Sequence, residues 1–189
     1  MKRSLALLMM WAAIALPARA ALDVGDKAPD FSVKAALGGN VFQYSLAAAL
    51  AKGPVVLYFF PAAFSQGCSV EAHQFAEAMP SFAALGASVI GVSGDEIDAI
   101  TKFSVQVCQG KFPVAADDQK KVIAAYDAAM TIMPDFANRV SYVIAPNGTV
   151  VSSYLSLNPD KHVERMLAAV AQWRKSTGAA KVEATAKAP

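Results

Sequence analysis

One cysteine, Cys68, stands where a predicted strand gives way to a predicted helix. A continuous apolar run covers residues 55–60, and apolar or small side chains at 72, 75, 76 and 79 have the spacing of one helix face. Pro61 opens the loop between these patterns, so Cys68 falls in the first turn of the helix. Unpaired backbone N–H groups and the helix dipole favour an anion at such a position. Because the thiolate is the reactive form of cysteine, this stretch predicts a nucleophile at Cys68.

The sequence offers Cys68 few polar partners. Ser65, three residues earlier, is able to cap the helix and to offer its hydroxyl to a bound oxygen atom, and these two roles are compatible. His73 lies about 140° around the helix from Cys68, which makes it a poor candidate for a general base. His162 falls in the last predicted helix, and the sequence suggests no partner for it.

The first twenty residues have the pattern of a secretory signal peptide. Lys2 and Arg3 precede an apolar stretch over residues 5–16, and residues 18–20 read Ala-Arg-Ala, the small-residue form of a cleavage site. We therefore expect cleavage after residue 20 and a periplasmic location. A retained N-terminal anchor is the alternative, although the apolar stretch is short for crossing a membrane.

The charge of the mature chain points to no polyanionic partner. The whole sequence has 17 Lys and Arg against 15 Asp and Glu, but three of the basic residues and none of the acidic ones lie in residues 1–20. Without them, 14 basic and 15 acidic side chains remain, a formal net charge of −1. We therefore expect neither nucleic acid nor, after cleavage, a membrane as partner.

The chain contains two cysteines, Cys68 and Cys108. Two cysteines in an exported protein form a disulfide by default, so a non-enzymatic domain with a structural Cys68–Cys108 bond is one alternative. The position of Cys68 at a helix start favours a reactive thiol instead. Two dispersed cysteines and two dispersed histidines lack metal-ligand spacing, and we expect no metal and no cofactor.

The order of the predicted elements indicates an α/β fold with a mixed central sheet, helices on both faces and an N-terminal hairpin. Apolar runs without alternation suit strands buried on both faces, and the helices between them imply parallel pairing. Strands are expected at 31–34, 41–44, 55–60, 87–92, 112–115, 140–144 and 149–155. Helices are expected at about 45–53, 66–79, 95–107, 118–130 and 160–174.

The chain divides into three parts on composition. Residues 1–20 are the signal peptide, and residues 21–175 form the single domain. Residues 176–189 carry almost no bulky apolar side chain and are predicted to be a disordered tail.

Four motifs follow one another in the chain. Pro61-x-x-x-Ser65-x-x-Cys68 is continued by Cys68-Ser69-Val70-Glu71. The segment 25–31 precedes them, and the strand 139–144 with its Asn-Gly turn follows them. Together they resemble the peroxiredoxins, the alkyl hydroperoxide reductase/thiol-specific antioxidant superfamily, and most of all the Q-type (bacterioferritin-comigratory) class. Ser65 stands where the family usually has Thr.

The resemblance implies a thioredoxin-like fold and a peroxidase that reduces hydrogen peroxide and small organic hydroperoxides. It assigns Cys68 as the peroxidatic residue, which becomes a sulfenic acid. It also assigns Pro61, Ser65 and Arg139 as the other residues of the active-site pocket. Without the resemblance, Arg139 would also suit an ordinary surface ion pair. Glu71 shares a helix face with Cys68, and two roles remain open for it: orienting Arg139, or lying in solvent as a first-turn acid.

The second cysteine departs from the commonest Q-type arrangement, in which it lies five residues after the first. This chain has His73 there, and Cys108 is closer to the arrangement with the partner in the next helix. Cys108 is therefore either the resolving residue of an intramolecular disulfide or a free bystander. The resemblance implies a thioredoxin-like protein as reductant, and we expect a monomer or weak homodimer. An exported thioredoxin-fold thiol-disulfide oxidoreductase is a further alternative, although the sequence lacks its Cys-x-x-Cys motif.

Overall fold

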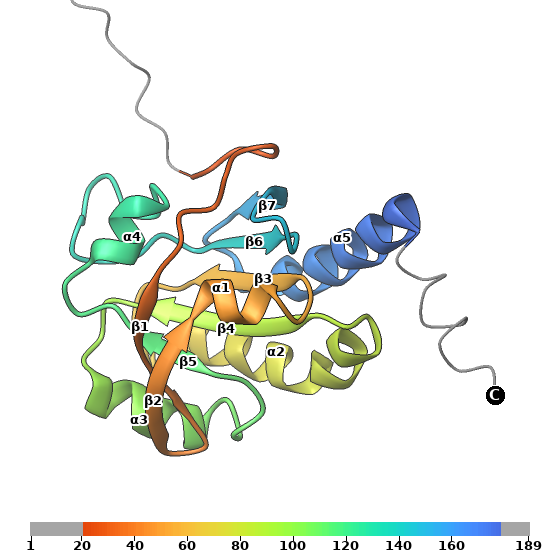
Figure 1. Ribbon diagram of the computed structural model, residues 1–189. Coiled ribbons are helices and arrows are strands. Elements are labelled where there is room, and N and C mark those ends of the chain that lie inside the picture. Colours follow the sequence, from red (N-terminus) through yellow and green to blue (C-terminus); the bar gives the residue numbers. More distant parts are fainter. Residues whose placement is uncertain (1–20, 179–189) are drawn as a thin grey trace, which may run out of the picture.

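The structure, a computed structural model, describes residues 21–178 (Figure 1). Its strands are β1 (Ser32–Leu37), β2 (Asn40–Ser45), β3 (Val55–Phe59), β4 (Ser88–Ser93), β5 (Val114–Ala116), β6 (Val140–Ile144) and β7 (Val150–Leu155). Its helices are α1 (Leu46–Leu50), α2 (Gln66–Ala84), α3 (Ile97–Gln106), α4 (Lys121–Ala125) and α5 (His162–Thr177), with the 3-10 turn η1 (Pro159–Lys161) before α5. The expected signal peptide and residues 179–189 of the expected tail lie outside the described residues.

One seven-stranded sheet contains all of these strands, in the order β2-β1-β5-β4-β3-β6-β7. The central strands β3, β4 and β5 are parallel to one another, and α2 and α3 connect them. β6 and β7 on one side, and β1 and β2 on the other, pair in antiparallel fashion. The predicted mixed sheet with an N-terminal hairpin is confirmed.

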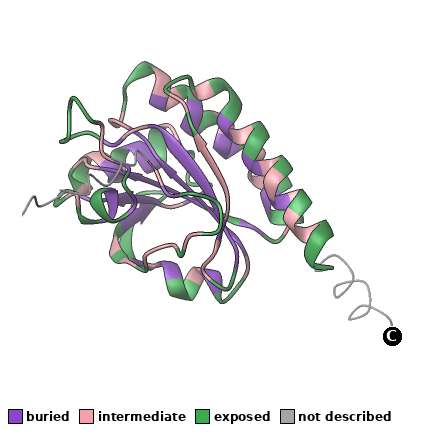
Figure 2. Cartoon of the chain, turned by 90° about the horizontal axis from the view of Figure 1, so that it is seen from above, coloured by how far each residue is buried: buried purple, intermediate pink, exposed green. Residues whose placement is uncertain are grey.

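β3 is buried along its whole length and contributes to a core on each face of the sheet. Its odd-numbered residues point into a core that also contains apolar residues of α1 and α4. Its even-numbered residues point into a second core, which contains the apolar faces of α2, α3 and α5. Figure 2 shows the buried sheet between helices whose outer faces are exposed. This two-sided burial explains why the sequence of β3 is apolar without alternation.

α2, which carries Cys68, is longer than the sequence pattern predicts. The apolar spacing indicated an end near Met79, but α2 continues through Pro80 to its last residue, Ala84. A proline inside a helix removes one backbone hydrogen bond. Phe82 is fully buried and stacks on Phe75 with 6.0 Å between the ring centroids, and this packing holds the last turn in place.

The helix predicted over residues 118–130 is wrong in its extent. α4 is only five residues long, because Lys120 and Asp127 on either side of it adopt left-handed backbone conformations, with φ of 58° and 50°. The buried carboxylate of Asp117 accepts a hydrogen bond from the backbone N–H of Ile123 at 2.7 Å and fixes this short helix.

The last helix begins in two steps. The Asn158 side chain accepts a hydrogen bond from the backbone N–H of Asp160 at 3.0 Å and caps η1, in which Pro159 is the first residue. The sequence pattern predicted a helix from about residue 160, but the α-helix itself starts only at His162 and continues to Thr177. His162 is thereby the first residue of α5, and its side chain is fully buried.

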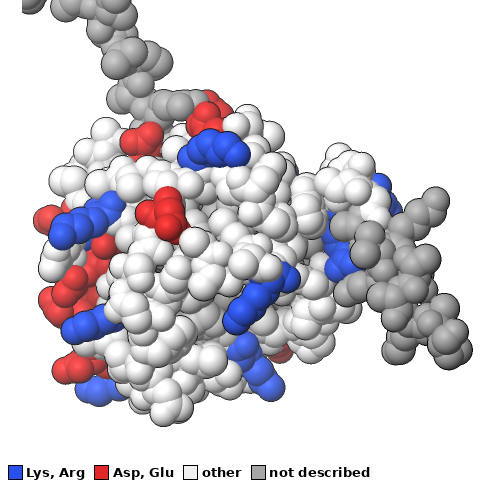
Figure 3. All heavy atoms as spheres, in the orientation of Figure 1, with Lys and Arg blue, Asp and Glu red and all other residues white. Residues whose placement is uncertain are grey.

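Charged side chains are dispersed over the face of the molecule shown in Figure 3, where basic and acidic side chains are interspersed. Exposed apolar side chains include Phe64, Ile132, Met133 and Phe136. Within residues 21–178, no helix is both long enough and apolar enough to cross a membrane.

Candidate active site

Cys68 is the third residue of α2, in the first helical turn after the loop that leaves β3. Its side chain is almost completely buried, and the sulfur is a free thiol. The predicted order of strand, loop and helix around Cys68 is therefore confirmed. This position places the sulfur at the end of α2 where backbone N–H groups and the helix dipole favour a negative charge.

The loop before α2 is anchored to the segment that follows β4. The carboxylate of Asp95 accepts hydrogen bonds from the backbone N–H of Ala63 at 2.7 Å and from the Ser93 hydroxyl at 2.8 Å. Phe64 adopts a left-handed conformation with φ of 64°, and its ring packs edge-on against Phe103 of α3. These contacts fix the point at which α2 begins, and with it the direction of the Cys68 side chain.

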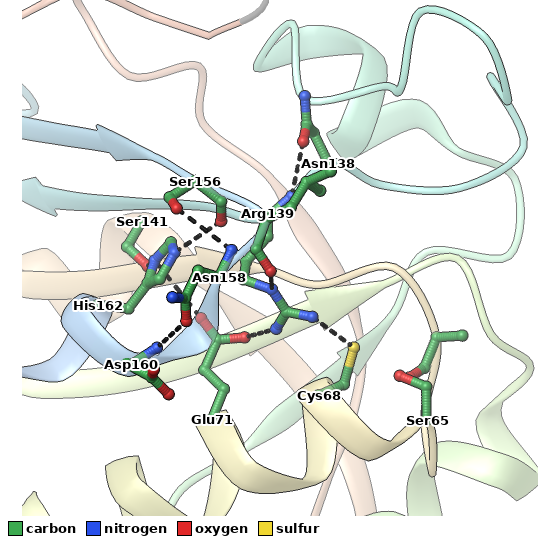
Figure 4. Close-up of polar contacts among 12 residues, drawn as sticks. Ser65, Cys68, Glu71, Asn138, Arg139, Ser141, Ser156, Asn158, Asp160 and His162 are labelled. Carbon is green, nitrogen blue, oxygen red and sulfur yellow. Dashed lines mark hydrogen bonds and ion pairs between the residues drawn. The ribbon is translucent and has the colours of Figure 1, made fainter.

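The guanidinium of Arg139 makes three contacts at the start of β6 (Figure 4). Nη2 donates to the sulfur of Cys68 at 3.3 Å, and Nη1 donates to Oε2 of Glu71. Nε donates to the backbone carbonyl of Leu157 at 2.9 Å. The arginine is thus held by α2 on one side and by the segment after β7 on the other. Its positive charge therefore faces the sulfur directly.

Glu71 is completely buried and forms an ion pair with Arg139. Of the two roles that the sequence left open, the solvent-exposed acid is wrong and the contact with Arg139 is observed. Burial raises the pKa of Glu71 to about 7, although the charge and hydrogen bond of Arg139 oppose the shift. Burial also acts to lower the pKa of Arg139, but Glu71 and Cys68 raise it above its usual value, so the guanidinium remains charged.

His162 is a buried neighbour of this group that the sequence did not suggest. Its Nδ1 lies 2.7 Å from the Ser141 hydroxyl and 3.5 Å from Oε1 of Glu71. Its Nε2 lies 2.9 Å from the carbonyl oxygen of Ser156. Burial lowers the pKa of His162 to about 4, against the hydrogen bond to Ser156, and the ring is neutral at pH 7. No sequence pattern links α5 to α2, so only the fold brings these residues together.

Ser65 occupies the N-cap position of α2, but its side chain makes no capping hydrogen bond. Its hydroxyl donates instead to the carbonyl oxygen of Ala62 at 3.1 Å. The side chain is exposed, and in the view of Figure 4 it lies on the far side of Cys68 from Arg139. Pro61 is half-buried at the start of the loop. The structure therefore brings Arg139 into contact with Cys68, whereas Pro61 and Ser65 lie in the segment that precedes α2.

Gly67 lies directly beside the guanidinium. A Cβ atom on this residue would lie 3.2 Å from Nη2 of Arg139, which is tight for a carbon atom. Gly67 therefore leaves room for Arg139 to reach the sulfur. The sequence analysis did not single out this glycine, and its only signal was its position next to Cys68.

Cys108 lies two residues beyond α3 and is completely buried, with a free thiol. Its backbone N–H donates to the carbonyl of Phe103 at 3.1 Å. Burial raises the pKa of the Cys108 thiol to about 12, so at neutral pH it is a thiol and a weak nucleophile in this structure. As predicted, Cys68 and Cys108 belong to different segments of the chain.

His73 points away from the site, as its angle around α2 predicted. Its half-exposed ring pairs with Glu77 at 3.3 Å and contacts the Gln109 side chain at 3.2 Å. Among the described residues, no group of three or more His, Cys, Asp or Glu side chains is arranged to hold a metal ion.

The family model AhpC/TSA matches residues 24–153, most of the described part of the chain. The chain belongs to this family. Peroxiredoxin Q from the chloroplast of Gentiana triflora is 31% identical over 144 residues, which are 76% of this chain and 64% of that relative. This member thus spans somewhat less than two thirds of its chloroplast relatives.

Bacterial relatives match this chain over at least 90% of their own length. A putative peroxiredoxin of Mycobacterium tuberculosis is 31% identical over 152 residues, which cover 78% of this chain and 95% of that protein. The crystal structure of peroxidoxin BcpB from the same organism superimposes with a TM-score of 0.71 at 29% identity, over 79% of this chain and 96% of that one. The Xanthomonas campestris bacterioferritin comigratory protein superimposes with a TM-score of 0.66 at 26% identity, over 74% and 90% of the two chains. This peroxiredoxin is of the Q type, and its fold is thioredoxin-like.

Proposed function

We propose that this protein is a thiol peroxidase in which Cys68 attacks hydrogen peroxide or a small organic hydroperoxide. The contact between the Cys68 sulfur and Nη2 of Arg139, in the first turn of α2, carries this proposal. The arginine charge and the helix N-terminus together favour the thiolate that the reaction needs. Membership of the peroxiredoxin family and the names of the relatives support the same chemistry.

The proposed reaction begins with attack of the Cys68 thiolate on one peroxide oxygen. An S–O bond forms, the O–O bond breaks, and the leaving oxygen takes a proton to become water or an alcohol. Cys68 becomes a sulfenic acid, and the peroxide is reduced by two electrons. Arg139 stabilises the negative charge that moves from sulfur to the leaving oxygen, and the Ser65 hydroxyl hydrogen-bonds the peroxide. Pro61 shields the site from solvent.

Cys108 is proposed to resolve the sulfenic acid. Its thiol attacks the Cys68 sulfur, water leaves, and an intramolecular disulfide forms. Cys68 lies in α2 and Cys108 lies beyond α3, and we expect α2 to unwind locally before the two sulfurs bond. A dithiol of a thioredoxin-like protein then reduces the disulfide by thiol–disulfide exchange.

We also propose that the mature protein works in the periplasm after removal of residues 1–20. The basic start, apolar stretch and Ala-Arg-Ala site of this segment support export. The intact mass of the protein recovered from a periplasmic fraction tests this point, and we expect a chain that begins at residue 21. A protein that keeps residues 1–20, or that remains inside the cell, would contradict the proposal.

A single-turnover titration tests the peroxidase itself. Fully reduced protein of residues 21–189 is mixed with one equivalent of hydrogen peroxide, and free thiols and intact mass are measured at once. We expect both thiols to disappear as one intramolecular disulfide, far faster than free cysteine reacts. Cys108→Ser should still consume peroxide and gain one oxygen atom, whereas Cys68→Ser should not react.

Two results would change the proposal. If the wild type gains an oxygen atom without forming a disulfide, Cys108 is not the resolving residue. If both thiols survive, or pair only at the slow rate of ordinary oxidation, Cys68 and Cys108 form a structural disulfide and the protein is not a peroxidase.

A further inference from the structure

Behind Arg139 lies a pair of buried titratable groups that the proposed mechanism does not use. Glu71 binds Arg139 through Oε2, but its other oxygen, Oε1, has no hydrogen-bond donor among the described residues. The ring nitrogen Nδ1 of His162 lies 3.5 Å from Oε1, and both side chains are fully buried. A buried carboxylate oxygen without a donor is unfavourable. A proton between Oε1 and Nδ1 would remove this cost.

The contacts of His162 show where the ring carries its hydrogen. The carbonyl oxygen of Ser156, 2.9 Å from Nε2, can only accept, so Nε2 carries a hydrogen. In the neutral ring, Nδ1 therefore has a lone pair and accepts from the Ser141 hydroxyl at 2.7 Å. Nδ1 is the atom at which the ring takes up a second proton, and it is also the atom that faces Glu71.

We propose that Glu71 and His162 share one exchangeable proton, and that this proton controls how strongly Arg139 acts on Cys68. When the pair holds the proton it has no net charge, and the full charge of Arg139 acts on the sulfur. When the proton leaves to solvent, the carboxylate of Glu71 partly neutralises Arg139 and repels the thiolate. Glu71 and His162 are positioning residues, because they act on Cys68 through Arg139.

Among the described residues, the charged partner of the pair is Arg139, which in turn contacts Cys68. Tyr58 of β3 is fully buried, and burial raises the pKa of its hydroxyl well above the usual value, so it stays protonated. From β7, Tyr154 packs against the ring of His162 with 4.7 Å between the ring centroids. Arg165 of α5 is exposed, and its Cζ lies over the Tyr154 ring, 4.4 Å from the ring centroid.

Electrostatics at the two positions support this arrangement. Burial raises the pKa of Glu71 to about 7, and burial lowers the pKa of His162 to about 4. Both groups thus favour their neutral forms, and together they bind one proton in the neutral pH range, as expected for a coupled buried pair.

Nuclear magnetic resonance of the two histidines tests the proposal. The proposal rests on the proposed function, in which Cys68 reacts as a thiolate. His73 and His162 are the only histidines in the sequence, and His73→Gln assigns their signals. In the reduced protein we expect the neutral Nε2–H form of His162 and a transition of its Nδ1 signal near neutral pH. The signal of the exposed His73 is the internal control.

Two variants give the decisive comparison. The amide of Glu71→Gln cannot ionise and is able to donate to Nδ1, so the transition of His162 near neutral pH should disappear. Cys68→Ser removes the negative sulfur, so the pair should lose its proton about one pH unit lower, a tenfold weaker proton affinity. The His73 signals should be the same in all three proteins, because neither substitution changes its contacts with Glu77 and Gln109.

Each alternative result has one meaning. If the transition persists in Glu71→Gln, the proton is not shared with Glu71 and the proposal is wrong. If its midpoint in Cys68→Ser equals that of the wild type, the pair does not act on Cys68, and the proposal is again wrong. The titration uses no peroxide. A protein that shows both expected changes but fails to reduce peroxide contradicts the proposed function and supports the shared proton.

Discussion

Arg139 is the residue on which the site depends most. Its planar guanidinium spans the Cys68 sulfur, the Glu71 carboxylate and the carbonyl oxygen of Leu157. A lysine carries the same charge but presents a single nitrogen that cannot reach all three acceptors in the geometry of a planar fork. The orientation of the donors, and not only the charge, therefore holds the site together.

Replacing Arg139 by lysine should separate these two effects. We expect Arg139→Lys to react with hydrogen peroxide about 10- to 100-fold more slowly than the wild type, because the directed hydrogen bond to the sulfur is lost while the charge remains. Stopped-flow measurement of the second-order rate constant checks this. Arg174→Lys, near the end of α5, is the matched control and should react at the wild-type rate. A wild-type rate in Arg139→Lys would show that charge alone is sufficient.

At this scale the sequence pointed to Cys68 and Arg139 but not to all of the residues that surround them. The helix start and the motif around Cys68 pointed to the nucleophile, and the resemblance pointed to Arg139. The contact of Glu71 with Arg139 was one of two open alternatives, because helix angle places a residue on a face without showing what covers that face. His162 could not be linked to the site, since it reaches Glu71 only after α5 packs on α2.

At the scale of elements, the Tyr58 ring of β3 lies over β4 and packs against α2. Gly91, which is the partner of Tyr58 on β4, leaves room for this ring, because a Cβ atom there would lie 2.7 Å from it. The Tyr58 ring also stacks on Phe75 of α2 with 4.4 Å between centroids. Its hydroxyl is buried without a hydrogen-bond partner among the described residues. The aromatic ring, and not the hydroxyl, is therefore what joins strand and helix.

Removing that hydroxyl should leave the domain at least as stable. We expect Tyr58→Phe to raise the free energy of unfolding by about 1 kcal/mol, because a buried polar group without a partner is lost. Tyr126→Phe is the matched control, since the Tyr126 hydroxyl donates to the carbonyl of Pro29 at 2.7 Å. That variant should lose about 1 kcal/mol. Urea unfolding measures both, and a clear loss of stability in Tyr58→Phe would show that its hydroxyl has a partner.

The helices and strands were predicted correctly where apolar residues repeat at a regular spacing. They were predicted incorrectly where tertiary packing determines the end of a helix. The strands around the sheet and the helix that starts before Cys68 follow from apolar runs and turn residues. The end of α2 was predicted near Met79, which is too early, because Phe82 packs in the core and stabilises a turn that Pro80 weakens. α4 was predicted too long, because left-handed residues such as Lys120 have no clear signature in the sequence.

In the molecule as a whole, the site residues lie at one end of the sheet. Cys68 follows β3, Asp95 follows β4, and Ser156 follows β7, while Arg139 immediately precedes β6. Because β6 is antiparallel to β3 and β7, the start of β6 lies beside the ends of the other strands, and these four residues lie at the same end of the sheet. The order of strands in the sheet, more than any single motif, gathers the site from distant parts of the sequence.

The buried carboxyl group at this edge should affect the stability of the entire domain. The pKa of Glu71 is about 7 in the folded protein and about 4.5 when exposed, so only the folded state holds the proton between these values. Its contribution to stability is therefore present below about pH 4.5 and lost as the pH rises through 7. The free energy of unfolding of the wild type minus that of Glu71→Gln should fall by about 2–3 kcal/mol from pH 4.5 to pH 8. Urea unfolding at several pH values measures this difference, and a difference that rises with pH would contradict the prediction.

Pro80 interrupts the hydrogen-bond ladder of α2 between a longer first part and a short last part. Because a proline has no N–H, the ladder of hydrogen bonds is interrupted at that turn, and unwinding of the first part does not have to propagate into the last. The last part stays anchored by Phe82, while the first part carries both Cys68 and Glu71. In the resolution step proposed above, exposing the Cys68 sulfur to Cys108 then needs a local unfolding of residues 66–79. The same opening would release Arg139 from both of its partners on α2, so that the oxidised cysteine would leave the charged site as it enters the proposed disulfide.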